Sequence, residues 1–164
     1  MEEALDEGTI ADLARHLASG AIDLASLTGL DDDELEAAYA KARAFLQAGA
    51  LAKAMLALAA LVLLRPSEFR FYRALGLAMQ GAQEYPRAFS VYGMALALRP
   101  GDVICSLLRA ECAVHIWGGV RGEPALREAM RLAQGETAAI PYVARAQALL
   151  KLLSAGGATK KREA

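Results

Sequence analysis

Cys105, Cys112 and His115 are the residues of this sequence whose types and spacing come closest to a chemical site. Thiolate and imidazole groups bind zinc, and the three residues form a Cys-x2-His pair with a second cysteine two helical turns earlier. A structural zinc site needs four converging ligands, and His16 is the remaining obvious donor. We therefore expect no metal, although a metalloprotein or enzyme built on these residues stays open as an alternative.

The two cysteines are also too far apart for a disulfide. They lie seven positions apart on one predicted helix, which separates them by about 10.5 Å along the helix axis and places them beyond disulfide reach. We expect buried, reduced thiols, as in a cytosolic protein.

Catalytic motifs are not recognisable in the sequence. The two histidines fall in different predicted units, the serines lack a Gly-x-Ser-x-Gly setting, and no glycine-rich phosphate loop follows a strand. The formal net charge of −1 gives no reason to expect nucleic acid as a partner. We predict a binding protein that is not an enzyme and carries no cofactor.

Alanine and leucine account for the high apolar content of the sequence, and both are good helix formers. Hydrophobic residues make up 55% of the 164 residues and aromatic residues 6%, with a mean hydropathy of +0.25. The uncharged run at residues 54–64 is shorter than the roughly twenty residues of a membrane span. The acidic N-terminus lacks the basic segment followed by an apolar segment that is typical of a signal peptide. We expect an all-α, cytoplasmic protein that does not insert into a membrane.

Pro66 and Pro100 stand 34 residues apart, and each closes a stretch rich in alanine and leucine. This period is typical of tetratricopeptide repeats, in which each unit is a helix-turn-helix. The spacing predicts a tetratricopeptide-repeat solenoid with units at residues 35–68, 69–102 and about 103–139.

The second of these units carries the repeat signature most completely. Gly76 and Ala88 are small residues where two helices cross, and Pro100 ends the second helix. The first unit is a degenerate copy. The third unit has a longer predicted turn at residues 117–124, and we expect its extra residues to lie in that turn and not in a helix.

Further elements flank the repeats. Residues 1–34 form a predicted N-terminal helical region with a helix at about 9–19, and acidic residues start the first repeat helix near Asp32. A capping helix at about 140–153 covers the last apolar face and ends the repeat domain at residue 155. Residues 156–164 are predicted to form a flexible basic tail.

The first helix of each repeat unit lines a concave surface, through positions 2, 5, 9 and 12 of the unit. These positions are Glu36, Tyr39, Arg43, Leu46, Arg70, Arg73, Leu77, Gln80, Ile104, Leu107, Glu111 and Val114. Their mixture of types predicts a groove for an extended peptide, whose side chains enter apolar pockets while arginines bind its carbonyl or acidic groups. For any single apolar position, the alternative is packing between helices.

Four segments carry a resemblance to a known family. They are residues 20–27, 33–39, 70–76 and 109–112. Their order and spacing resemble those of the class II chaperones of bacterial type III secretion, over about residues 9–155. The resemblance implies a cytosolic chaperone that binds and stabilises hydrophobic translocator proteins before their export. It also implies that Tyr39 is a groove residue.

The resemblance further implies a homodimer formed through the N-terminal helical region. Ile10, Leu13 and Leu17 of that region stand at apolar helical spacing. The sequence departs from the family at Arg43 and Leu46, where members carry aromatic residues, and in the longer turn of the third unit. Two alternatives therefore stay open: a generic repeat adaptor that binds a peptide of another partner, and a structural subunit of a secretion apparatus.

Overall fold

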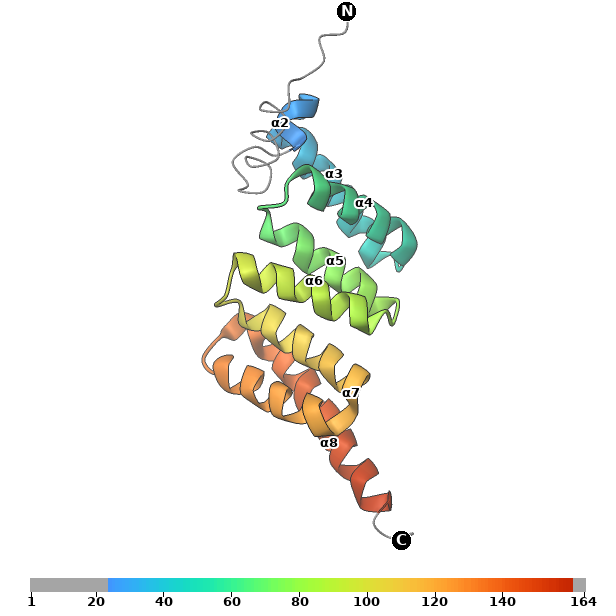
Figure 1. Cartoon of the computed structure of the whole chain (residues 1–164), viewed down its shortest axis with the longest axis vertical. Helices are drawn as coiled ribbons and strands as arrows, with labels where there is room; N and C mark the ends of the chain where they lie inside the picture. Colours follow the sequence, from blue (N-terminus) through green and yellow to red (C-terminus); the bar gives the residue numbers. More distant parts are fainter. Residues whose placement is uncertain (1–23, 161–164) are drawn as a thin grey trace, which may run out of the picture. The chain divides into compact units, whose positions relative to one another are not determined.

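The computed structural model describes residues 24–160, which fold into α-helices and one short 3-10 helix (Figure 1). Within this range no residue lies in a strand, so the all-α prediction is confirmed. The chain divides between Phe71 and Tyr72 into two compact units, named unit 1 and unit 2. The predicted helix at residues 9–19, with Ile10, Leu13 and Leu17, lies outside the described residues.

Unit 1 contains α2 (Leu24–Thr28), α3 (Asp32–Gln47), α4 (Leu51–Leu64) and the first residues of α5 (Phe69–Gly81). A capping box begins α3. The Asp31 carboxylate accepts a hydrogen bond from the Glu34 amide at 2.8 Å, and the Glu34 carboxylate accepts one from the Asp31 amide at 3.1 Å. These bonds satisfy amides that a helix leaves unpaired, and the predicted start near Asp32 is confirmed.

The helices α3 and α4 pack against each other as the first helical pair. The buried residues of the pair are Leu35, Tyr39, Ala42, Ala54, Leu58 and Leu61. On each helix they recur at intervals of three or four residues, which is the pattern of a single buried face. The pair therefore follows from the apolar spacing of the sequence.

Unit 2 contains the rest of α5, followed by α6 (Tyr85–Leu98), α7 (Val103–Leu132), η1 (Thr137–Ala139) and α8 (Ile140–Lys160). The helices α5 and α6 approach closely at Gly76. A Cβ atom there would lie 2.4 Å from a ring carbon of Tyr92, so no larger residue fits without movement of that ring. The predicted need for a small residue at Gly76 is confirmed.

The helix α7 is a helical hairpin and not one straight helix (Figure 1). Gly118 interrupts it with torsions of φ 67° and ψ −163°. Residues 119–124 are helical, so the prediction of a longer turn at 117–124 is wrong. The reason is packing. At Gly122 a Cβ atom would lie 2.3 Å from the Cα atom of Val114, so this glycine lets the second half of the hairpin rest on the first.

The helix α8 packs on α7 and covers its apolar face. Ala146 of α8 lies in one buried cluster with Leu107, Val114 and Leu126, as expected of a capping helix. The helix continues beyond residue 153 and ends at Lys160, so the first part of the predicted flexible tail is helical. Glycine lowers helix propensity without ending a helix, because each added residue still contributes a backbone hydrogen bond.

By length and composition, one helix within residues 24–160 could cross a membrane, and that helix is α7. The break at Gly118 leaves two halves, each shorter than the roughly twenty residues of a span. Leu107, Leu108 and Cys112 of the first half are completely buried in unit 2. In this fold α7 is a core element.

Candidate peptide-binding site

Unit 2 contains a pocket that brings together three of the predicted groove residues, Leu77, Gln80 and Glu111. The pocket has a volume of about 450 Å³ and lies between α5, α7 and α8. Its walls also include Tyr85, His115, Arg145, Leu149 and Leu152. We name it the Glu111 pocket.

Glu111 is the centre of a hydrogen-bond network in this pocket. Its side chain is 3% exposed, and Arg145 of α8 donates to it from Nε at 2.8 Å and from Nη2 at 2.5 Å. The Gln80 amide donates to Glu111 Oε2 at 2.9 Å, and the Tyr92 hydroxyl donates to Gln80 Oε1 at 2.9 Å. A buried carboxylate is tolerated when it is paired and hydrogen-bonded. The network therefore ties α5, α6 and α8 to α7.

The contacts of this network also set the pKa values of two of its members. The hydrogen bonds to Glu111 raise the pKa of Arg145 above its ordinary value, which keeps the guanidinium charged. Burial raises the pKa of the Tyr92 hydroxyl, so it stays protonated and can donate to Gln80. Arg145 is 52% exposed and carries a permanent positive charge at the pocket surface.

Aromatic and apolar side chains form the other walls of the Glu111 pocket. Tyr85 and His115 stack, with ring centroids 4.0 Å apart and ring planes 5° from parallel. Leu77 is half-buried, and Leu152 of α8 is largely exposed. Apolar surface beside a few fixed polar groups is the chemistry of a peptide-binding site.

In unit 1, the predicted groove residue Tyr39 is 7% exposed and its ring centroid lies 5.2 Å from that of Phe71. The guanidinium groups of Arg70 and Arg43 lie over the Tyr39 ring, at 5.3 Å and 5.9 Å from its centroid. Arg70 also forms an ion pair with Glu36 at 3.1 Å. Tyr39 is therefore covered by arginines, and a ligand on this surface would meet the arginines first.

The other predicted groove residues differ in exposure. Leu107 and Val114 are buried in the cluster that α7 forms with α8, so both pack between helices. Leu46, Arg73 and Ile104 are half-buried.

The role of α8 in the pocket was missed in the sequence, although a signal was present. Arg145 follows Glu111 by 34 residues, and Arg70 follows its own partner Glu36 by the same 34 residues. This distance equals one repeat period, and equivalent positions of neighbouring units lie side by side in a solenoid. An acidic and a basic residue separated by one period therefore predict an ion pair.

Cys105 and Cys112 are buried free thiols, as the sequence predicts. Burial raises the pKa of each thiol to about 12, so neither is a thiolate at neutral pH. His115 is exposed, and its ring stacks on that of Tyr85. Within residues 24–160, no three histidine, cysteine or acidic side chains are grouped so that they could hold a metal ion.

Comparison with known proteins places this fold among the proteins of type III secretion. No protein-family model and no curated protein sequence matches the chain. Solved structures do match it. A type III secretion complex from Aeromonas hydrophila is 23% identical with a TM-score of 0.77, and the match covers 90% of this chain and 97% of that one.

Two further matches are chaperones solved with peptides. The type III secretion chaperone SycD of Yersinia enterocolitica, in complex with a peptide of the translocator YopD, is 22% identical with a TM-score of 0.68, and the match covers 77% of this chain and 97% of SycD. PcrH of Pseudomonas aeruginosa, in complex with the chaperone-binding region of PopD, is 27% identical with a TM-score of 0.69. That match covers 79% of this chain and 97% of PcrH.

The fold is therefore that of a helical-repeat chaperone of type III secretion. The resemblance to class II chaperones that the sequence indicated is confirmed.

Proposed function

We propose that this protein is a type III secretion chaperone that binds and stabilises hydrophobic translocator proteins before their export. The observation that carries the proposal is the fold shared with chaperones whose structures hold segments of the translocators YopD, PopD and PopB. A protein that binds apolar segments reversibly lowers the concentration of free, aggregation-prone chain. This role needs neither a catalytic centre nor a nucleotide, and it belongs in the bacterial cytoplasm.

The Glu111 pocket supports the proposal because its groups match those of an extended peptide. Leu77, Leu149 and Leu152 supply apolar surface for one or two client side chains. Arg145 uses Nε and Nη2 for Glu111, which leaves its Nη1 group for a client carbonyl or carboxylate. Charge and apolar surface therefore meet within one pocket.

Unit 1 offers a second set of groups for the same client. Arg43 is exposed beside the covered ring of Tyr39, and Arg70 is half-buried next to it. We assign these arginines to the binding of carbonyl or acidic groups of the client. We also propose a homodimer through the N-terminal region, in keeping with the dimer reported for SycD.

The experiment that tests the proposal is affinity purification of the tagged protein from the cytosol of its host, with mass spectrometry of the bound chains. Wild type is compared with Leu77→Glu in the Glu111 pocket and with Leu56→Glu, a largely exposed position of α4. We expect wild type and Leu56→Glu to retain proteins with paired long apolar segments, and Leu77→Glu to lose them. Circular dichroism of each variant reports whether helicity is kept.

Other outcomes would contradict either the proposed role or the proposed site. Recovery of folded soluble partners alone would favour the generic adaptor. Equal retention of translocators by Leu77→Glu would exclude the Glu111 pocket as the site, while leaving the chaperone role intact. A charged residue in place of Tyr39 is expected to destabilise unit 1 as well as to affect binding, because Tyr39 is buried, so Leu77→Glu is the more specific test.

A further inference from the structure

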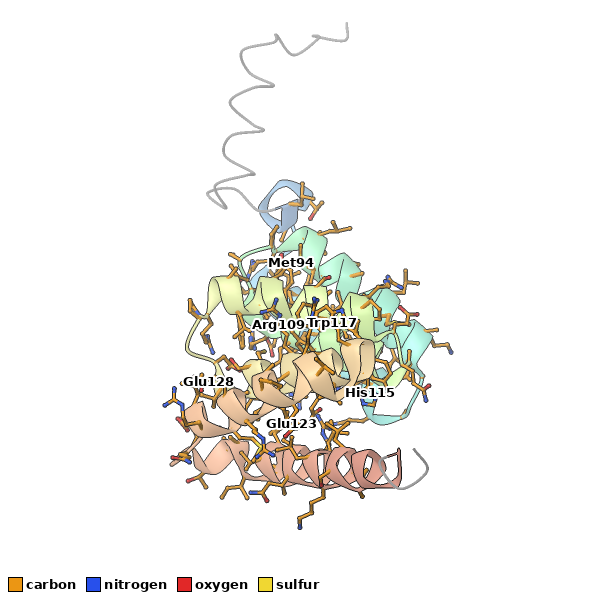
Figure 2. The ribbon with its side chains drawn as sticks, turned by 60° about the horizontal axis from the view of Figure 1, so that its bottom comes forward. Met94, Arg109, His115, Trp117, Glu123 and Glu128 are labelled. Atoms are coloured by element: carbon orange, nitrogen blue, oxygen red, sulfur yellow. The ribbon has the colours of Figure 1, made fainter. Side chains whose placement is uncertain are left out.

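Unit 2 has a second hollow, on the opposite side of the first half of α7 from Glu111. It has a volume of about 360 Å³ and lies between α6 and the two halves of the α7 hairpin. Its lining includes Arg109 of α7. Arg109 precedes Glu111 by two residues, which corresponds to about 200° of rotation around the helix axis. We name it the Arg109 groove. Figure 2 shows Arg109 and Trp117, which both line it, close together in the view.

The walls of the Arg109 groove are aromatic and apolar. The Phe89 and Trp117 rings meet edge to face, with centroids 5.0 Å apart and an interplanar angle of 83°. Trp117 is 43% exposed, and Leu132 at the other end of the hairpin is also exposed. An exposed apolar rim around a hollow is characteristic of a protein-binding surface.

Arg109 places a positive charge in this apolar setting. Its guanidinium carbon lies 4.1 Å from the centroid of the Phe89 ring. Its Nε atom is buried and has no hydrogen-bond partner within the described residues. A buried donor without an acceptor costs free energy, and the guanidinium group has further N–H donors that a carboxylate in the groove can bind.

The charges around the groove favour an acidic ligand. Arg121 is an exposed second cation in the lining. The carboxylate of Glu128 also lines the groove, but it accepts two hydrogen bonds from Arg131, at 2.8 Å and 2.7 Å. It is therefore engaged outside the groove, and the surplus charge of the lining is positive.

The length of the groove favours a polypeptide over a small molecule. The lining of the first half of α7 runs from Ser106 to Trp117, a distance of roughly 16 Å at 1.5 Å per residue. An extended chain of about five residues spans this length.

We propose that the Arg109 groove is a second peptide-binding site, which takes a polypeptide segment carrying a large apolar side chain next to an acidic residue. The apolar side chain packs against Phe89 and Trp117, and the carboxylate accepts hydrogen bonds from Arg109. The site lies apart from the Glu111 pocket, so the two can be occupied together. It does not depend on the identity of the client proposed above.

Trp117 makes the proposal directly testable, because it is the single tryptophan of the chain. The probes are the capped peptide Ac-Ala-Leu-Asp-Phe-Leu-Ala-NH2 and the same peptide with asparagine in place of aspartate. Each is titrated into the full-length protein while the emission of Trp117 is recorded. We expect the acidic peptide to give a saturable blue shift, and the asparagine peptide to bind about tenfold more weakly, because its amide oxygen accepts from arginine without the negative charge of a carboxylate.

Three variants locate the binding. Arg109→Gln removes the cation and is expected to weaken the acidic peptide about tenfold. Ala125→Glu adds a negative charge at an exposed position of the lining and is expected to abolish binding without affecting the core. Arg127→Gln, at an exposed arginine outside the groove that pairs with Glu123, is the matched control and should bind as wild type does.

Any of three results would overturn the proposal: no saturable change with the acidic peptide, equal affinity for both peptides, or equal affinity of Arg109→Gln and wild type. An emission shift that appears on raising the protein concentration without peptide would mean that a second copy of the chain fills the groove. That result would overturn it as well.

Discussion

At the scale of single residues, the most informative feature of the molecule is the carboxylate of Glu111. Glu111 is the one charged residue that is buried among the side chains that the structure describes, and it accepts hydrogen bonds from α5 and α8. Removal of one partner of a buried ion pair leaves the other charge without compensation, which costs more than the loss of a surface pair. The stability of unit 2 therefore depends on Arg145.

We predict that Arg145→Met lowers the free energy of unfolding by about 2 kcal/mol, below the usual range for a fully buried pair because Arg145 is half exposed. The double variant Glu111→Met/Arg145→Met should recover most of this loss, since an apolar pair replaces the ion pair. Urea denaturation followed by circular dichroism measures both.

The control is Arg127→Met, which removes an exposed ion pair to Glu123. It should change stability by less than about 0.5 kcal/mol. If Arg145→Met behaves like this control, the Glu111 network is not a stabilising feature.

At the scale of elements, the α7 hairpin and α8 distinguish this chain from a regular array of repeats. The hairpin replaces a connecting loop with one residue of positive φ, Gly118. The helix α8 both caps the core and supplies Arg145 to the Glu111 pocket. Its ion pair repeats the 34-residue spacing of Glu36 and Arg70, so Arg145 follows its partner by one repeat period, as Arg70 does.

We predict that Gly122→Ala destabilises unit 2 by about 3 kcal/mol, because the new methyl group would meet the backbone of Val114, which cannot turn aside. Thermal unfolding measures the effect.

Gly119→Ala is the control within the same helix. A Cβ atom there would have its nearest neighbour at 3.9 Å, in the side chain of Leu153. The control should be neutral or slightly stabilising, since alanine favours a helix over glycine. Equal stability of both variants would show that the two halves of the hairpin do not pack as described.

At the scale of the whole molecule, the proposed chaperone role requires a client and, by the same proposal, a second copy of the chain. The residues assigned to the dimer precede the described part of the structure. We predict that changing Ile10, Leu13 and Leu17 together to serine halves the mass measured by size-exclusion chromatography with light scattering. The physical reason is the loss of apolar area that a helix pair buries.

A matched control changes two exposed leucines of α4, Leu56 and Leu63, to serine. The mass should then stay that of the dimer. A lower mass for the control, with an unchanged mass for the triple variant, would move the interface to α4.

The sequence by itself determined the helical class, the repeat period and the residues of the first two helical pairs. These features depend on local rules: apolar spacing along a helix, capping at Asp31 and Asp32, and the inability of proline to continue a helix. It also placed Leu77, Gln80 and Glu111 on equivalent helix faces, and they meet in one pocket.

Only the tertiary structure decided the path of the chain from Trp117 to Pro124, the burial of Tyr39, Leu107 and Val114, and the partner of Glu111. A glycine-rich segment looks the same in a sequence whether its glycines form a loop or let two helices touch. Likewise, whether an apolar residue of a helix lines a groove or fills a core depends on what packs over it. For Leu107 and Val114 this is α8, whose Ala146 lies more than thirty residues away in the sequence, so no rule about neighbouring residues predicts their burial.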